Sequence, residues 1–216
     1  MKKALLILSV LLGSNCMSQT KITTNNKLII PHGDITLYLS DDTCTMVSKH
    51  ILPYNKFNKI GSVPRDNHWF QDTYKGKYTK NSFVRTGYDL GHLTPSSITT
   101  YDTTTNHNSF SMFNEAPQLA KFNEHPWKEL EIDVEDTIAK YKSDAIIITG
   151  VIYDMKVKNY LPNSRIRIPT HYFKVLVINK KSWYWIGSNY NGGILTTDLS
   201  ELNKIFKKNK MGLIIK

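Results

Sequence analysis

Apolar residues recur along this chain with two different spacings, which separate one long helix from several short strands. Residues 127–141 repeat an apolar side chain every three or four positions, the pattern of an amphipathic helix. Pro126 fits the first turn of such a helix, where its missing N–H has no partner to lose. The spacing therefore predicts a helix that begins near residues 123–126 and ends near Lys142.

Short apolar and β-branched runs lie on both sides of this helix. The expected strands are residues 35–40, 46–52, 145–151, 165–178, 183–190 and 212–215. A last helix is expected from a cap at Thr197 or Asp198 to about Lys208. Residues 19–33 are expected to form a loose lead-in, and residues 53–82 a long loop region with short pieces of strand. Strands before and after a long helix predict an α+β fold or a mixed layer fold.

The first 18 residues have the pattern of a secretory signal peptide. Two lysines precede a short apolar run, and small or polar residues follow it. Lipid attachment at Cys16 is the alternative, which Asn15 disfavours because a small residue is wanted at that position. We therefore expect cleavage near Ser18 and a secreted or periplasmic protein. No segment after residue 20 approaches the ~20 apolar residues that a membrane helix needs, so no membrane span is expected.

The composition adds a strong positive charge to this picture. Lys and Arg total 28 against 18 Asp and Glu, which gives a net charge of +10. Such a charge favours a polyanionic partner, namely nucleic acid, an anionic glycan or a membrane surface. The two cysteines exclude a disulfide scaffold and a multi-cysteine zinc site. Removal of residues 1–18 leaves only Cys44, which is interpreted as a small buried residue rather than a nucleophile.

Two segments carry candidate chemistry. His92 follows Gly91 directly, which predicts a tight turn that presents one ring nitrogen as a general base. Further on, Asn123 at the helix start and Glu131 two turns later offer amide and carboxylate oxygens, which suit a hard cation such as Mg²⁺. On spacing alone, a helix cap and a solvated surface charge explain Asn123 and Glu131 better than a metal site does.

Taken together, these segments resemble the DNA/RNA non-specific endonucleases, relatives of endonuclease G with the ββα-metal (His-Me finger) fold. The resemblance is carried by residues 89–92 (DLGH), 114–118 (NEAPQ) and 123–131 (NEHPWKELE), and further on by residues 149–153 and 168–174. It covers residues 60–216, which are expected to form the nuclease domain, with residues 19–59 as an N-terminal lead-in carrying the first strands. The resemblance implies an antiparallel or mixed sheet and a long metal-bearing helix.

The family also implies roles for individual residues. His92 would activate water for attack on phosphorus, and Asn114 would support it. Asn123 would be the sole direct protein ligand of a mostly hydrated Mg²⁺ or Mn²⁺, and Glu131 would hold one of the waters on that ion. The implied substrates are DNA and RNA, contacted through their backbones without sequence specificity.

One position departs from the family pattern. The arginine that the family has next to its Gly-His pair is Leu90 here. Arg65 resembles a second family arginine, upstream of an aromatic-x-x-Asp element at residues 69–72, and Arg85 is another nearby guanidinium. Loss of one charge-stabilising donor commonly lowers a rate by about 10²–10³-fold. The alternative expectation is therefore a weakened or inactive basic nucleic-acid-binding protein on the same fold.

Overall fold

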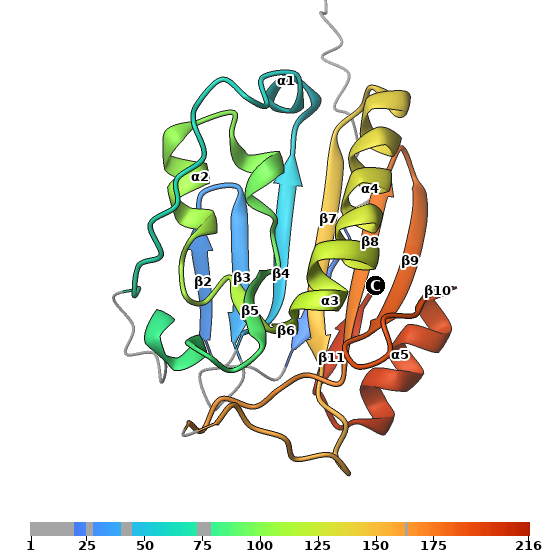
Figure 1. Ribbon diagram of the computed structural model, residues 1–216. Helices are drawn as coiled ribbons and strands as arrows, with labels where there is room; N and C mark the ends of the chain where they lie inside the picture. Colours follow the sequence, from blue (N-terminus) through green and yellow to red (C-terminus); the bar gives the residue numbers. More distant parts are fainter. Residues whose placement is uncertain (1–19, 25–27, 40–44, 73–78, 163) are drawn as a thin grey trace, which may run out of the picture.

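A seven-stranded sheet forms the centre of the protein. The structure is a computed structural model that describes residues 20–24, 28–39, 45–72, 79–162 and 164–216. All neighbouring strands of this sheet are antiparallel (Figure 1). In spatial order they are β10 (Ile194–Thr197), β9 (Lys181–Ser188), β8 (His171–Ile178), β7 (Ala145–Ile152), β4 (Thr45–Leu52), β3 (Ile35–Leu39) and β2 (Leu28–His32).

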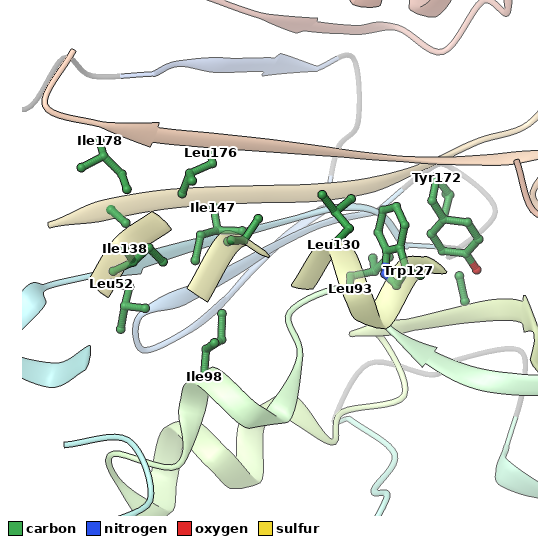
Figure 2. Packing of buried hydrophobic residues seen from close by; sticks show 14 of the residues in the cluster. Leu52, Leu93, Ile98, Trp127, Leu130, Ile138, Ile147, Tyr172, Leu176 and Ile178 are labelled. Atoms are coloured by element: carbon green, nitrogen blue, oxygen red, sulfur yellow. The ribbon is translucent and has the colours of Figure 1, made fainter. Parts of the chain in front are cut away.

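The long helix α4 (Lys128–Tyr141) covers one face of this sheet. Its apolar stripe includes Leu130 and Ile138, which are buried in one cluster with Ile147 of β7 and Leu176 of β8. Figure 2 shows these side chains between the helix and the strands. Burial of one such side chain contributes roughly 1.5–3 kcal/mol, so the stripe fixes the helix on the sheet.

The helix α5 (Leu199–Lys208) covers the opposite face. Leu202 and Phe206 are buried in a second cluster, with Ile146 and Ile148 of β7. Successive residues of β7 therefore point to opposite helices, which is why this strand is apolar along its whole length. Asp198 caps α5, because its side chain accepts a hydrogen bond from the backbone N–H of Glu201.

A separate two-stranded sheet lies in front of the central sheet and carries part of the site (Figure 1). It consists of β5 (Tyr88–His92) and β6 (Glu115–Leu119), paired antiparallel. The remaining elements are β1 (Ile22–Thr24) paired with β11 (Leu213–Ile215), the helices α1 (Tyr54–Phe57) and α2 (Thr103–Ser109), and the 3₁₀ turns η1 (Lys80–Phe83) and η2 (Ser96–Thr99).

The helix before α4 is built differently from the prediction. Helical backbone begins at α3 (Ala120–Phe122), and a π-helical turn, η3 (Asn123–Trp127), joins it to α4. Pro126 lies inside this turn and cannot donate the usual i→i−4 hydrogen bond, which favours a wider turn. At the other end the prediction is confirmed: Tyr141 is the last residue, and Lys142 caps the helix in the left-handed region with φ 48°.

Most predicted elements are confirmed to within one or two residues, namely the strands expected at 35–40, 46–52, 145–151, 183–190 and 212–215, and the final helix. The expected strand 165–178 is wrong in its first part, since β8 begins only at His171. The expected loose lead-in is also wrong, because residues 22–24 and 28–32 form β1 and β2. Ile30 is buried there, and Pro31 is tolerated because β2 is an edge strand.

The expected lead-in and nuclease segments contribute strands to one sheet. The strands β2, β3 and β4 come from residues 28–52, and β4 pairs with β7. No helix within the described ranges is long and apolar enough to cross a membrane. The expected signal peptide, with Cys16, and the isolated Cys44 lie outside the described residues.

Candidate active site

A pocket of about 530 Å³ brings four of the five predicted site residues together. Arg65 comes from the long loop, His92 from the end of β5, Asn123 from the π turn η3, and Glu131 from the first turn of α4. The remaining lining residues are Pro95, Ser96, Ser97, Glu124 and Lys128. The pocket therefore lies between the β5–β6 hairpin and the start of the long helix. The fifth predicted residue, Asn114, is not part of the lining.

Two aromatic rings enclose the His92 imidazole. The Trp69 ring lies 4.6 Å away, centroid to centroid, and the Phe110 ring contacts it edge-on at 5.0 Å. The Nε2 atom of His92 is buried and has no hydrogen-bond partner among the described residues. Burial, reinforced by the positive charge of Arg65, lowers the pKa of His92 to about 3. The imidazole is therefore neutral at physiological pH.

The expected tight turn at Gly91 is not present. Gly91 lies inside β5, opposite Ala116. A Cβ atom at this position would lie 2.2 Å from the Gln118 side-chain oxygen Oε1, so the glycine makes room for a neighbouring side chain. His92 is consequently placed by a strand ladder, where it pairs with Glu115, rather than by a turn.

Asp89 orients the Asn123 amide. The Asn123 nitrogen Nδ2 donates a hydrogen bond of 2.9 Å to Asp89 Oδ2. This contact leaves the amide oxygen Oδ1 as the atom available to a cation. Among the described residues, no group of three or more His, Cys, Asp or Glu could hold a metal ion. The pocket does offer the amide oxygen of Asn123 and the carboxylate of Glu131, which are hard oxygen donors that fit a largely hydrated Mg²⁺.

A buried lysine on the central sheet, Lys174, contacts Glu131. Lys174 Nζ lies 3.3 Å from Glu131 Oε1 and also donates a hydrogen bond of 3.1 Å to Thr149. Burial raises the pKa of Glu131, and the Lys174 charge opposes that effect. Sequence reasoning missed Lys174, although a lysine within the apolar run of β8 is the signal that could have found it.

Asn114 supports the backbone that follows His92. Its Oδ1 accepts a hydrogen bond of 3.0 Å from the Thr94 N–H, and its Nδ2 donates to the carbonyls of Thr94 and Ser109, each at 2.8 Å. Its own carbonyl accepts from the Leu93 N–H at 2.8 Å. The residue is completely buried. These contacts position the segment behind the imidazole, and they leave no polar atom of the side chain facing the pocket.

Arg65, Arg85 and Leu90, the positions considered for the family's arginine, have different surroundings. Arg65 lines the pocket, and its guanidinium lies 5.4 Å from the Phe110 ring centroid. Arg85 is exposed, has a φ of 58°, and is not a lining residue. Leu90 is partly buried against an apolar cluster that includes Phe83. The guanidinium in the pocket is therefore that of Arg65.

A β-hairpin that carries a histidine, followed by a helix that carries an asparagine and a glutamate, defines the ββα-metal class of nucleases. The fold agrees with this class: a solved structure of the EndoG/EndoGI complex superposes with a TM-score of 0.71 over 86% of this chain and 84% of that chain, at 20% identity. The DNA/RNA non-specific endonuclease family matches residues 13–210. The chain belongs to this family.

Two relatives have partial sequence similarity to the chain. The mitochondrial nuclease of Saccharomyces cerevisiae is 29% identical over 148 residues, which are 61% of this chain and 44% of the yeast protein. Human mitochondrial endonuclease G is 25% identical over 109 residues, which are 46% of this chain and 36% of the human protein. The chain thus spans less than half the length of each of these relatives.

Proposed function

We propose that this protein is a secreted, metal-dependent endonuclease that hydrolyses phosphodiester bonds of DNA and RNA without sequence specificity. One observation carries the proposal. A single pocket contains a neutral histidine, a guanidinium and an oriented amide oxygen, contributed by His92, Arg65 and Asn123. Phosphodiester hydrolysis needs a proton acceptor for water and positive charge around the phosphate, and these groups supply both.

His92 acts as the general base in this proposal. We assign the role to Nδ1, because Nε2 is buried and has no hydrogen-bond partner among the described residues. The low pKa of the free imidazole keeps the ring unprotonated, which is the form that a general base must have. An approaching phosphodiester brings negative charge close to the ring and raises its pKa toward the range in which proton transfer is efficient.

Asn123 and Glu131 form the side of the pocket that would hold Mg²⁺ or Mn²⁺. Asn123 offers its Oδ1 as the direct ligand, and the Glu131 carboxylate orients water at the site. The cation, when bound, supplies positive charge that stabilises the pentacovalent phosphorus and the departing 3′-oxygen. The Asp89 hydrogen bond keeps the amide oxygen rather than the amide nitrogen turned toward that position.

Arg65 takes over the phosphate contact that Leu90 cannot make. Its guanidinium lines the same pocket as His92, and Lys128 adds a second positive side chain to the lining. Contacts of this kind are made to the phosphate and carry no base information, in keeping with a non-specific enzyme. Residues 1–18 hold two lysines and no acidic residue, so the chain from Gln19 onward keeps a net charge of +8, from 26 basic and 18 acidic residues. This charge supports the same partner, because it raises the affinity for any polyanion.

Plasmid cleavage tests the proposal. The wild-type protein should nick and linearise DNA and degrade RNA in Mg²⁺, and EDTA should stop both reactions. His92→Ala should lower the rate by about 10²–10⁴-fold, the usual contribution of a general base. His68→Ala is the matched control, since that imidazole is 91% exposed and is not a pocket residue. Metal-independent cleavage, or an unchanged rate in His92→Ala, would contradict the proposal.

A second candidate function rests on Leu90. A basic protein that binds nucleic acid on this fold without cutting it would bind DNA in a salt-dependent manner but show no cleavage. Leu90→Arg distinguishes the two candidates, because it restores the missing guanidinium. A gain of more than a hundredfold in cleavage would show that the natural site is compromised. A wild type that already cleaves and gains nothing from Leu90→Arg would show that Arg65 suffices.

Secretion is the remaining part of the proposal. It rests on the pattern of residues 1–18, where two lysines precede a short apolar run. Mass spectrometry of the protein recovered from culture medium or periplasm should give a chain that begins at Gln19. A lipid-modified Cys16 at the N-terminus would contradict it.

A further inference from the structure

A buried lysine, Lys174, lies behind the pocket and contacts the lining residue Glu131. Lys174 is in the middle of β8, and its side chain is only 1% exposed. Lysine is almost never fully buried unless it is paired. We propose that Lys174 is a positioning residue, which holds the Glu131 carboxylate in place at the cation side of the pocket. The inference rests on the proposed function insofar as the pocket binds a divalent cation.

Three contacts fix the ammonium group. Nζ is 3.3 Å from Glu131 Oε1, donates a hydrogen bond of 3.1 Å to Thr149 Oγ1, and lies 4.9 Å from the centroid of the Trp127 ring. The carboxylate, the hydroxyl and the aromatic face surround one charge. The ammonium therefore has little freedom to move, and the carboxylate oxygen that it contacts is held with it.

The fold dictates this arrangement. Thr149 and Lys174 face each other as a register pair of β7 and β8, so both side chains point to the same side of the sheet. Trp127 and Glu131 are four residues apart and therefore lie on the same side of the helix. Tyr172 and Leu176, two positions to either side of Lys174 on β8, belong to the cluster beneath α4. The helix thus places its aromatic ring and its carboxylate over the one charged residue on this side of the strand.

Stability does not explain the pair. A buried ion pair is often no more stable than well-packed apolar residues of the same volume, because both ions lose their hydration. A methionine at position 174 could fill this space between apolar neighbours. The pair does serve the pocket. Glu131 lines the pocket with a side chain that is 18% exposed, and the buried Lys174 holds that side chain from behind.

The charges around the pair agree with this role. Burial raises the pKa of Glu131, and the Lys174 charge and hydrogen bond act against that rise. Burial likewise lowers the pKa of Lys174, which Glu131 and the more distant Glu135 oppose. Each partner thus favours the ionised form of the other. Loss of the lysine would leave a carboxylate that is both mobile and easier to protonate.

Mn²⁺ binding in the absence of nucleic acid tests the inference. An isothermal titration of Lys174→Met should show a dissociation constant about 10–100-fold higher than wild type, the usual effect of losing a partner behind a metal site. Lys204→Met is the matched control, since it also removes a lysine 3.3 Å from a glutamate, Glu201, but at an exposed site. That control should bind Mn²⁺ like the wild type. Circular dichroism establishes that each variant is folded.

A double-mutant cycle separates positioning from a general structural effect. If Lys174 acts through the carboxylate, Lys174→Met should add nothing to Glu131→Gln, because the group that it positions is already gone. In the active enzyme, Lys174→Met should also raise the Mg²⁺ concentration for half-maximal cleavage while the KM for DNA stays the same. Wild-type Mn²⁺ affinity in folded Lys174→Met, or additive effects in the cycle, would overturn the inference.

A milder substitution keeps the test decisive if Lys174→Met does not fold. Thr149→Val preserves the shape of the side chain and removes the other hydrogen bond of the ammonium. It should weaken Mn²⁺ binding in the same direction but less, and unchanged binding would overturn the inference. Because the titration contains no nucleic acid, it gives a result even if the wild-type protein fails to cleave. Failure of the proposed function and failure of this inference are thereby distinguished.

Discussion

Replacing Asp89 by alanine tests how the proposed cation ligand is held. In the structure Asp89 Oδ2 accepts a hydrogen bond of 2.9 Å from Asn123 Nδ2. Without the carboxylate, the amide can rotate and present its nitrogen, which cannot bind a cation. A hydrogen bond to a charged group is worth about 1.5–3 kcal/mol. Since 1.36 kcal/mol corresponds to a factor of ten, affinity for the cation should fall roughly 10- to 150-fold.

The assay is plasmid cleavage over a Mg²⁺ titration at a fixed DNA concentration. Asp89→Ala should shift the half-maximal Mg²⁺ concentration upward by the factor given above, and saturating Mg²⁺ should restore much of the rate. Asp89→Asn should give an intermediate shift, because a neutral amide oxygen still accepts the hydrogen bond but more weakly. Asp133→Ala, on the exposed side of α4, is the control and should have no effect.

A folded Asp89→Ala protein whose half-maximal Mg²⁺ concentration stays within about threefold of the wild type would show that Asp89 does not hold the cation ligand, because a lost charged hydrogen bond costs more than that. An equal shift in the Asp133→Ala control would lead to the same conclusion. A fall in the rate at saturating Mg²⁺, with no change in the half-maximal concentration, would place Asp89 in another role.

Three further predictions concern single side chains. Arg65→Ala should lower kcat/KM by about 10²–10³-fold. Arg65→Lys should restore only part of the lost activity, because an ammonium cannot make the directed contacts of a guanidinium. Full activity in Arg65→Lys would contradict this. Burial raises the pKa of Glu115 well above its ordinary 4.5, so its contribution to stability is lost as the pH rises from 4.5. The urea midpoint of the wild type should therefore fall between pH 5 and pH 8, and that of Glu115→Gln should fall less. An equal fall in both proteins would contradict this. Burial lowers the pKa of His50 from 6.5 to about 4. The free energy of unfolding should therefore fall by roughly 3 kcal/mol as the pH drops from 6.5 to 4, because the buried imidazole must then take up a proton. His50→Gln should remove this part of the pH dependence in urea unfolding.

The sequence predicted those helices and strands whose apolar residues follow directly from which of their faces are buried. The stripe that includes Leu130 and Ile138 predicts α4 because a helix on one face of a sheet must be apolar every third or fourth residue. The run at residues 145–151 predicts β7 because this strand is covered by a helix on both faces.

The β5–β6 hairpin could not be predicted in this way. The strand β5 contains Asp89 and Gly91, and β6 contains Pro117 and Gln118, so neither segment alternates between apolar and polar residues. Their polar side chains are accommodated by particular neighbours, such as the space that Gly91 leaves for Gln118. The residues of β5 suit a strand only because of their neighbours on β6, so neither segment by itself has the alternating pattern that predicts a strand.

The site contacts join residues that are far apart in the chain. Asp89 and Asn123 are separated by 34 positions, and Glu131 and Lys174 by 43. No spacing rule connects such pairs, and the resemblance to a nuclease family supplied His92, Asn123 and Glu131 without showing what holds them. Asp89 and Lys174 lie on the strands β5 and β8, and only the folded chain brings them into contact with Asn123 and Glu131.

A crystal structure of the protein soaked in Mn²⁺ would show where a cation binds, because the anomalous signal locates the ion. We expect one ion at about 2.0–2.2 Å from Asn123 Oδ1, with water filling most of the remaining positions and the His92 ring facing the same pocket. An ion bound elsewhere, or an Asn123 amide that turns its nitrogen toward the ion, would contradict it.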